Sequence, residues 1–286
     1  MKILFKYFII ALFILLFGCK DEPRETPTKG YLKCYVDESL YNVVKDEADL
    51  FMNLYPQTKI DLIPVKAREG IVTILNNESE MFVSSRDLNN EEKKYAQKIK
   101  SEIKQFKFCY DGIAVISNNK FVDDKISLLD LKNLLTGKSR KYKIVIPERN
   151  SGVFENITSH LLLENQLSGA EIVNSESDVI KKIRTANNSL GLVGLNTLKG
   201  IKGIKILKVG TNESNILGPS YYEPLAGYLV NGSYPLVRTT YIFLNEIGIG
   251  VASGFTTFLT SNEGQKVVMK NDLGPATVPV KLIQLN

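Results

Sequence analysis

Residues 31–65 read YLKCYVDESLYNVVKDEADLFMNLYPQTKIDLIPV and predict a strand, a helix and a second strand in succession. The stretch 31–37 is rich in apolar and aromatic residues, as strands are. Apolar residues then recur at helical spacing from Leu40 to Leu54, and residues 59–65 form another apolar run. A strand, a helix and a strand in this order are typical of an α/β fold with parallel strands.

The rest of the chain repeats this alternation of strands and helices. The expected strands cover residues 81–83, 106–117, 142–147, the region around Val173, 191–195, 204–209 and 239–244. The expected helices cover residues 90–101, 127–137, 154–161, 179–183 and 255–268. Two successive groups of this kind predict an α/β protein of two lobes, each a mostly parallel sheet flanked by helices.

The composition of the 286 residues is that of a globular protein, with 44% hydrophobic and 23% charged residues. The net charge of +5 is small and no dense Lys/Arg stripe is present, so a nucleic acid is not an expected partner. One histidine, His160, and three cysteines are too few for a histidine-rich or zinc-ribbon metal site. Because no Gly-x-Ser-x-Gly elbow occurs either, we expect neither an enzyme nor a cofactor, and His160 is interpreted as a surface or packed helical residue.

The N-terminus predicts export from the cytoplasm. Lys2 and Lys6 precede an apolar run at residues 7–17, which has the length of a signal-peptide core and is shorter than the roughly 20 residues that span a bilayer. The run is followed by glycine and Cys19, which resembles a bacterial lipobox. This resemblance implies a signal peptide over residues 1–18, cleavage before Cys19 and acylation of the Cys19 thiol, for example by palmitate. An uncleaved anchor and an ordinary signal peptide are the alternatives.

Residues 19–30 are polar, contain two prolines and lack periodicity, so they are expected to tether a folded domain to the membrane. Residues 20–22, KDE, resemble a short signal that directs lipoproteins to the cell surface, although a solvated linker has the same composition. We therefore expect a membrane-anchored lipoprotein of the cell envelope that faces the periplasm or the cell exterior. Cys34 and Cys109 lie in expected strands, where either a disulfide or two free buried cysteines would fit this compartment.

Three expected strands end in loops that carry a serine, namely Ser39, Ser85 and Ser151. Such loops offer a hydroxyl group and unpaired backbone N–H groups, which together bind an oxyanion. Arg86 and Arg149 lie beside two of the serines and can donate forked, charge-assisted hydrogen bonds. Helix capping would explain each serine on its own. Together they predict a small-anion site, because ligands of α/β sheets bind at the carboxyl ends of the strands.

Eight stretches of the chain resemble, in order, the substrate-binding protein of the phosphate-specific ABC transporter, a type II periplasmic binding protein. They are VDESLYNVVKDEADLFMNLYP (36–56), VSSRDLNNEEKKYA (83–96), YDGIAVISN (110–118), ISLLDLKNLLTGK (126–138), RNSGVFENI (149–157), GLVGL (191–195), YPLVRTTYIFL (234–244) and GFTTFLTSNEGQKVV with LGPAT (254–277). The most similar pattern is that of the lipoprotein branch, which has Asp-Glu-Ser in its first loop. The resemblance covers nearly the whole mature chain.

This resemblance implies a phosphate site assembled from the three serine loops. The matched positions are Ser39, Ser85, Arg86, Ser151, Gly152 and Val153. Val153 stands where the family has a threonine, so the hydroxyl is missing and only the backbone N–H remains. The family's arginine, four residues before the third serine, is Pro147 in this chain, and Arg149 is expected to substitute for it.

Asp37, Glu38 and Asp87 are the candidate carboxylates of this site. At neutral pH phosphate still carries a proton that a carboxylate can accept, whereas sulfate carries none and is repelled. Two acids beside one dianion are unfavourable unless the arginines compensate for them. The three acids are therefore expected either to select phosphate or to be solvated residues of the loops.

We expect lobe I to comprise residues 31–117 and 229–286, and lobe II to comprise residues 118–228, with the chain crossing between them near residues 110–118 and 225–240. The resemblance implies a monomer that captures phosphate or a related oxyanion between the lobes. It also implies an ABC permease in the membrane as the partner that receives the ligand. The alternative is a surface-exposed interaction or sensor lipoprotein that uses the same fold without transport.

Overall fold

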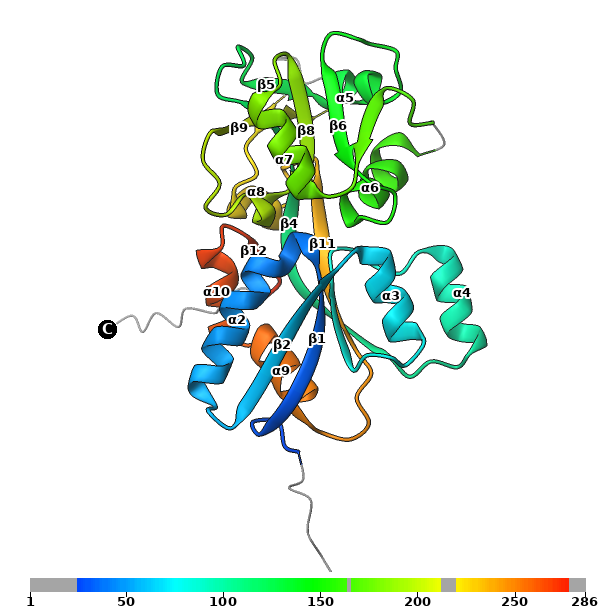
Figure 1. Cartoon of the computed structure of the whole chain (residues 1–286), viewed down its shortest axis with the longest axis vertical. Coiled ribbons are helices and arrows are strands. Elements are labelled where there is room, and N and C mark those ends of the chain that lie inside the picture. Colours follow the sequence, from blue (N-terminus) through cyan, green and yellow to red (C-terminus); the bar gives the residue numbers. More distant parts are fainter. Residues whose placement is uncertain (1–24, 164–165, 212–219, 278–286) are drawn as a thin grey trace, which may run out of the picture.

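The computed structural model describes residues 25–163, 166–211 and 220–277. Two lobes follow one another along the long axis of the molecule, and long strands connect them (Figure 1). The predicted two-lobed α/β fold is confirmed, but the sheets are mixed instead of mostly parallel, because the connecting strands pair antiparallel with their neighbours. The predicted signal peptide at residues 1–18 and the predicted lipidation site, Cys19, lie outside the described residues. Within the described ranges, no helix has both the length and the apolar character needed to cross a membrane.

The sheet of lobe I is centred on β1 (Gly30–Asp37), which pairs in parallel with β2 (Thr58–Val65) and β3 (Met81–Ser84). The carboxyl ends of these strands point toward lobe II (Figure 1). The helices of this lobe are α2 (Tyr41–Leu54), α3 (Ala67–Leu75), α4 (Asn90–Lys98), α9 (Val251–Thr260) and α10 (Asn262–Lys270). Buried residues of α2, α9 and α10 form one core with β1, and residues of α3 form a second core with β3.

The two lobes are joined by β4 (Lys104–Asn118) and β11 (Val237–Leu244), which pair antiparallel to each other. The first half of β4 lies beside β11 and β12 (Gly274–Pro275) in lobe I. The second half of β4 pairs with two strands of lobe II, β8 (Ser189–Gly194) and β9 (Ile204–Gly210). A single strand therefore belongs to the sheets of both lobes.

Lobe II has a parallel set of strands in which β6 (Lys143–Pro147) lies between β7 (Ala170–Val173) and β8. Its smaller strands β5 (Lys125–Ser127) and β10 (Tyr221–Tyr222) pair with β9. The helices of lobe II are α5 (Leu128–Leu135), α6 (Gly152–Asn156), α7 (Glu176–Thr185) and α8 (Ala226–Val230). The remaining described helical elements are short, namely η1 (Glu38–Leu40) in lobe I and η2 (Ile157–Leu162) and η3 (Leu195–Leu198) in lobe II. The two lobes have separate buried clusters, and the exact borders between the lobes remain a prediction.

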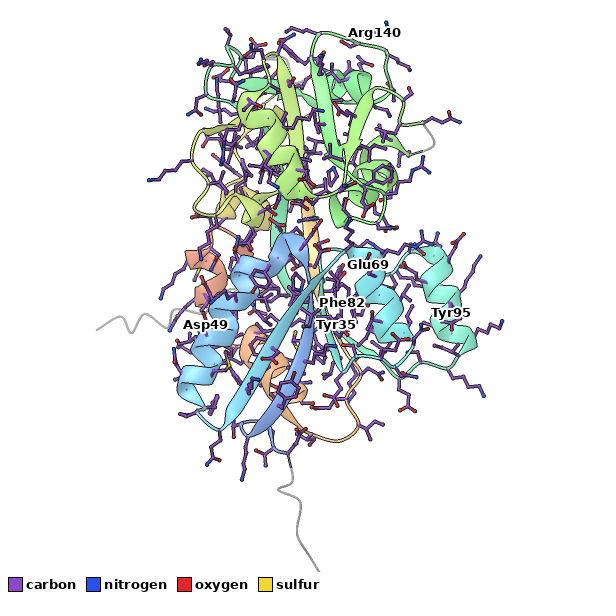
Figure 2. The ribbon with its side chains drawn as sticks, viewed as in Figure 1. Tyr35, Asp49, Glu69, Phe82, Tyr95 and Arg140 are labelled. Carbon is purple, nitrogen blue, oxygen red and sulfur yellow. The ribbon has the colours of Figure 1, made fainter. Side chains whose placement is uncertain are left out.

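Figure 2 places Phe82 and Tyr35 in the middle of lobe I, whereas Asp49 and Tyr95 lie at its periphery and Arg140 lies at the far end of lobe II.

The helix α3 has no counterpart among the predicted elements. Its Gly70 weakens the helical pattern, since glycine is unfavourable inside a helix. A Cβ atom at Gly70 would overlap the ring of Phe82, so glycine allows α3 to pack closely on β3. The local cost of this residue is thus offset by a contact that the sequence alone does not reveal.

Cys34 and Cys109 are both free and buried in lobe I. The disulfide that the sequence left open is therefore not formed. Burial raises the pKa of each thiol far above its ordinary value, so neither is a reactive thiolate at neutral pH.

The predicted helix at 154–161 is divided between α6 and the π-helical turn η2.

Glu47 lies on α2 in the core of lobe I, with an exposed fraction of 0%. Neither of its carboxyl oxygens has a hydrogen-bond partner among the described residues. Burial raises the pKa of Glu47 to about 9, with a smaller contribution from the negative charge of Asp46. Glu47 is therefore a neutral acid at physiological pH, because an unpaired buried carboxylate would be costly.

We predict that Glu47→Gln changes stability in a pH-dependent manner. The pKa of Glu47 is about 9 in the folded protein and about 4.3 in an unfolded chain. The stabilisation from the retained proton is complete below the lower value and is lost as the pH rises to the higher one. The melting temperature of the Gln variant relative to wild type should therefore rise steadily between about pH 5 and about pH 9. If the difference in melting temperature between the variant and wild type stayed constant over this pH range, the raised pKa of Glu47 would be contradicted.

Candidate functional site

Asp37, at the end of β1, is the centre of a hydrogen-bonded cluster on the lobe I side of the interface between the lobes. The Asp37 Oδ1 atom accepts hydrogen bonds from the backbone N–H of Ser39 at 2.9 Å and from the Ser39 hydroxyl at 2.7 Å. The Ser85 hydroxyl donates to Asp37 Oδ2 at 2.5 Å. All three residues are buried. Two of the predicted serines and one predicted carboxylate are thus in direct contact.

The third serine loop approaches this cluster from lobe II. Ser151 caps the first turn of α6, and its hydroxyl accepts a hydrogen bond from the backbone N–H of Phe154 at 3.1 Å. A Cβ atom at Gly152 would overlap the Ser85 hydroxyl and lie 3.2 Å from Asp37 Oδ2. Glycine is therefore required here by the closeness of the two lobes. Gly152 and the adjacent Val153 are both buried, and Val153 belongs to the apolar core of lobe II.

Arg238 on β11 and Asp111 on β4 form a buried ion pair between the two connecting strands. Arg238 donates to Asp111 Oδ2 from Nε at 3.0 Å and from Nη2 at 2.6 Å. Its Nη2 atom also donates to the Ser39 hydroxyl at 2.8 Å, which connects the ion pair to the first serine loop. Burial raises the pKa of Asp111, and the positive charge of Arg238 opposes this shift.

The remaining guanidinium nitrogen of Arg238, Nη1, is buried and has no hydrogen-bond partner among the described residues. Only 3% of Arg238 is exposed. An unpaired N–H group of a buried cation is unfavourable, so this atom is expected to bind an acceptor outside the described residues. It is the clearest unsatisfied donor in the cluster.

Glu176, at the start of α7 in lobe II, contributes a third carboxyl group. Its Oε2 atom accepts hydrogen bonds from the Gly194 backbone N–H and the Thr197 hydroxyl, both at 2.7 Å. Its Oε1 atom is buried and has no hydrogen-bond partner among the described residues. Burial raises the pKa of Glu176 to about 7, and the charge of Arg238 opposes the shift. A Cβ atom at Gly194 would overlap Arg238 Nη2, so glycine again permits the close approach.

Glu38 is half-buried, and its Oε1 atom has no hydrogen-bond partner within the described chain. Burial raises the pKa of Glu38 to about 7, and the negative charges of Glu176 and Asp37 contribute further. Arg238 thus carries one positive charge in a region with four carboxyl groups, those of Asp37, Glu38, Asp111 and Glu176. An anion can bind in this surrounding only if some of the carboxyl groups are protonated or accept protons from the anion.

Arg86 and Asp87 lie at the rim of the cluster and are occupied by other partners. Arg86 binds Glu92 through two hydrogen bonds of 2.7 and 2.8 Å, and its Nε atom lies 2.5 Å from Glu155 Oε2 of lobe II. Asp87 forms an ion pair of 2.7 Å with Lys93. The ion pair with Glu155 links the two lobes, so Arg86 contributes to their contact.

Arg149 and His160 are both exposed in lobe II. Arg149 has no hydrogen bond or ion pair with any described residue. The exposed position of His160 on η2 agrees with the prediction that it is an ordinary helical histidine. Neither residue contacts the cluster around Asp37, although Arg149 is two positions from Ser151 and can add positive charge nearby.

The lobes also contact each other on both sides of the cluster. On one side, Lys66 of lobe I forms an ion pair with Glu148 and donates to the Asn174 carbonyl at 2.7 Å. On the other side, the Asn196 side chain accepts a hydrogen bond from the backbone N–H of Val43 at 3.0 Å. The described conformation is therefore one in which the lobes have closed on each other.

A hollow of about 460 Å³ opens between the lobes and reaches the cluster at Arg238. Arg86 and Arg238 line it from lobe I and the connecting strand, and Glu155 and His160 line it from lobe II.

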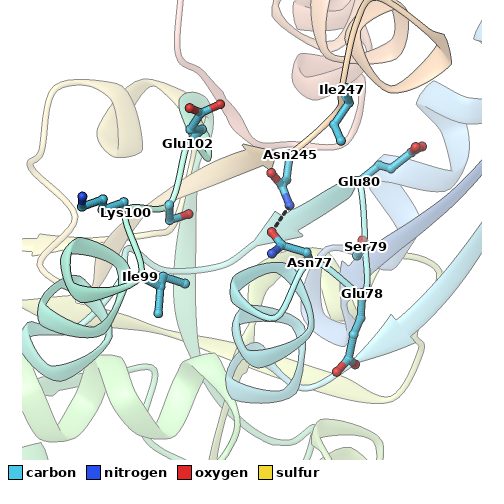
Figure 3. Close-up of a pocket in the computed structure, with 10 residues that line it drawn as sticks. Asn77, Glu78, Ser79, Glu80, Ile99, Lys100, Glu102, Asn245 and Ile247 are labelled. Atoms are coloured by element: carbon cyan, nitrogen blue, oxygen red, sulfur yellow. Dashed lines mark hydrogen bonds between the residues drawn. The ribbon is translucent and has the colours of Figure 1, made fainter.

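Figure 3 shows a different pocket, of about 570 Å³, on lobe I away from this cleft. Three glutamates and one lysine are among its lining residues, so its charge is unsuitable for a phosphate ion.

Four residues of the cluster were missed by sequence reasoning, namely Asp111, Glu176, Gly194 and Arg238. The signal for two of them is present, because Asp111 and Arg238 are charged residues within the otherwise apolar strand stretches YDGIAVIS and YPLVRTTYIFL. A charged residue in a central strand must be paired when it is buried. The sequence does not show that these two are each other's partners, because 127 positions separate them.

The chain matches the PBP superfamily domain over residues 21–263 and therefore belongs to the PBP superfamily. It is similar to the phosphate-binding protein PstS of Staphylococcus saprophyticus, with 24% identity over 227 residues, which cover 74% of this chain and 69% of the relative. It is also similar to the phosphate-binding protein PstS of Staphylococcus aureus, with 26% identity over 198 residues, which cover 64% of this chain and 59% of the relative.

Solved structures show the same fold. A protein from Clostridium perfringens, assigned as a phosphate ABC transporter substrate-binding protein and solved with bound phosphate, has a TM-score of 0.74 at 21% identity, covering 87% of this chain and 100% of that one. An ABC-type phosphate transport receptor from Vibrio cholerae has a TM-score of 0.64 at 16% identity, covering 85% and 99%. The expectation of a binding protein of this family, as opposed to an enzyme, is confirmed by the family match.

We predict that Gly152→Ala prevents the lobes from closing without unfolding either one. The added methyl group would overlap the Ser85 hydroxyl, whereas the matched control Gly227→Ala places a methyl group in open space. Small-angle scattering should show a larger radius of gyration for the Gly152 variant only, with both melting curves remaining cooperative. An unchanged radius for Gly152→Ala would show that the contact between the lobes is not limited by this glycine.

Proposed function

We propose that this protein captures inorganic phosphate, or a closely related oxyanion, between its two lobes for uptake by an ABC transporter. The observation that carries the proposal is the buried Nη1 donor of Arg238, which has no partner within the described chain. It lies in a cluster where hydroxyl groups from Ser39 and Ser85 meet the Ser151–Gly152 loop of the other lobe. An oxyanion placed there would accept the free N–H and the hydroxyl hydrogen bonds together.

Asp37 gives this site a means of selecting phosphate. In the closed arrangement its carboxylate already accepts two hydroxyl hydrogen bonds and one from a backbone N–H. On binding, the hydroxyl groups of Ser39 and Ser85 would turn from Asp37 to the anion and donate to it. A bound hydrogen phosphate would then donate its own proton to Asp37, whereas sulfate has no proton to donate. Glu38 is a second candidate acceptor. Asp87 is less suited, since it is paired with Lys93 at the rim.

The ligand site that we propose consists of residues from both lobes and from a connecting strand. Its members are Asp37, Ser39, Ser85, Ser151, Gly152, Val153 through its backbone N–H, and Arg238, with Arg86 and Arg149 supplying positive charge at the rim. The relatives with 24% and 26% identity are phosphate-binding proteins, which supports phosphate as the ligand.

We further propose that Cys19 carries the lipid anchor and that residues 19–30 tether the protein to the membrane. The protein would act as a monomer of the cell envelope and deliver its ligand to an ABC permease. Lobe I would comprise residues 31–117 and 229–286, and lobe II residues 118–228. The alternative, a surface interaction or sensor lipoprotein without transport, would show no stabilisation by any oxyanion.

Thermal shift on residues 20–286 with phosphate, arsenate, sulfate and molybdate tests the ligand. Phosphate at about one hundred times its dissociation constant should add about 2.7 kcal/mol to the stability. Sulfate should have little effect, because Asp37 repels it. An absence of any shift with all four anions would contradict the transport function.

We predict that Asp37→Asn weakens phosphate binding by about 10- to 100-fold, because a charge-assisted hydrogen bond is worth about 1.5–3 kcal/mol. The same variant should reduce the difference in affinity between phosphate and sulfate, since the negative charge that repels sulfate is removed. Asp87→Asn is the matched control and should leave the affinity nearly unchanged, because Asp87 pairs with Lys93. Calorimetric titration measures both, and equal losses in the two variants would exclude Asp37 as the selective group.

We predict that phosphate affinity depends on pH through Glu176. Since its pKa is raised to about 7, the carboxyl group is neutral at about pH 6 and ionised at about pH 8, where its charge opposes a bound anion. The ratio of the affinity of Glu176→Gln to that of wild type should therefore rise by about three- to tenfold over this range. The titration of phosphate itself cancels in the ratio. A ratio that is independent of pH would contradict the prediction.

A further inference from the structure

The end of lobe I that is farthest from lobe II exposes several apolar side chains. Leu54 and Tyr55, at the end of α2, are 53% and 37% exposed. Ile249, in the loop between β11 and α9, is 72% exposed, and Ile247 in the same loop is fully exposed. Figure 3 shows Ile247 on this loop, where it is also one of the residues that line the pocket drawn there. We call Leu54, Tyr55, Ile247 and Ile249 the basal patch.

A groove of about 490 Å³ runs through the basal patch. Leu54, Tyr55 and Ile249 line it together with the more deeply placed Phe51 and Phe258. The chain at Pro27 also lines the groove. A Cβ atom at Gly254 on α9 would overlap the Pro27 carbonyl oxygen, so the N-terminal segment is held tightly against this helix. The chain therefore enters the folded domain at the basal patch.

The distance from this entry point to the proposed lipid anchor is short. Glu25, the first described residue, is six positions after Cys19. Six residues span at most about 21 Å when fully extended. If Cys19 carries a lipid, the basal patch is confined to within about 20 Å of the membrane surface. This inference thus rests on the proposed anchoring at Cys19, but not on the identity of the ligand.

Aromatic and charged side chains lie beside the patch, and they include the acids Asp61, which contacts Tyr31 and Lys59, and Glu263, which lines the groove. Tyr31, on β1, is 46% exposed, and Lys59 of the adjacent β2 has its Nζ atom 5.4 Å from the centroid of the Tyr31 ring. Lys29 is exposed at the entry of the chain. Tyrosine and lysine next to exposed aliphatic residues are typical of surfaces that contact the interfacial region of a bilayer, where the lysines meet anionic headgroups.

We propose that the basal patch binds the phospholipid surface of the membrane that holds the anchor. Leu54, Ile247 and Ile249 enter the headgroup boundary, and the connecting strands then direct lobe II away from the bilayer. A lipid anchor with one or two chains gives binding that a second contact strengthens. The patch is that second contact, and it restricts the orientation of the tethered protein.

The absence of tryptophan from the sequence allows a direct test. The chain from Cys19 onward is coupled through the Cys19 thiol to a maleimide lipid in phosphatidylcholine–phosphatidylglycerol vesicles that contain doxyl-labelled lipid. Ile249→Trp reports on the basal patch. Val122→Trp is the matched control, because Val122 is 92% exposed and lies in lobe II. We expect blue-shifted and quenched emission for Ile249→Trp and unchanged emission for Val122→Trp.

A second variant distinguishes binding by the patch from mere proximity of the tether. Adding Leu54→Asp and Ile247→Asp to Ile249→Trp should reduce the quenching at least severalfold, with the melting temperature as the control for folding. Equal quenching of the Trp at positions 249 and 122, or no quenching at either, would overturn the proposal. A blue shift of Ile249→Trp at high concentration without vesicles would also overturn it, because a second copy would then be the occupant.

This experiment is independent of whether the cell lipidates the protein. The chemical coupling supplies the anchor, and mass spectrometry of the protein from its native membrane tests the acylation of Cys19 separately. An unmodified Cys19 would contradict the proposed anchoring, whereas a failure of the vesicle experiment would contradict only the basal patch as a membrane contact.

Discussion

The ion pair between Arg238 and Asp111 joins the two strands that connect the lobes, and nearly all of both side chains is buried. Such a pair requires good geometry, because the cost of removing two charges from water is otherwise not offset. Two hydrogen bonds to one Asp111 oxygen fix the guanidinium, and a third, to Ser39, aligns the first serine loop with it. The two N–H groups of Nη1 have no partner among the described residues. The position of the proposed anion follows from this constraint, because the other groups of the site are arranged around the same guanidinium.

The lobes meet where side chains are small. Gly152 and Gly194, both of lobe II, stand against Ser85 and Arg238 respectively, and a methyl group at either position would overlap its neighbour. Lobe II therefore contributes backbone to the interface at these two points. The acids near the cluster would repel a fully ionised dianion, so the ligand must bring a proton or the acids must keep theirs. The pKa values of Glu38 and Glu176 are raised to about 7, so these two acids can keep their protons. Asp37, which accepts hydrogen bonds from two serine hydroxyls, is the acid that can accept a proton from the ligand.

Much of the fold could be predicted from the sequence, because the alternation of apolar runs and helical periods is local. β1, α2 and β2 begin and end within one residue of the predicted bounds. The helix α3 was missed, since its Gly70 is explained only by the ring of Phe82. The three serine loops could be recognised because each follows a strand directly. The partners of Arg86 and of Arg238 could not be predicted, because an arginine's sequence neighbours do not reveal which distant carboxylate it will meet after folding.

A crystal structure of residues 20–286 grown with phosphate would test the central claim most directly. We predict that a phosphate oxygen lies within hydrogen-bond distance of Arg238 Nη1, with the hydroxyl groups of Ser39 and Ser85 and the Gly152 loop of lobe II around the same ion, and with Asp37 close enough to accept its proton. A phosphate bound at the exposed Arg149 or elsewhere on the surface, with the cluster between the lobes unchanged, would contradict this account.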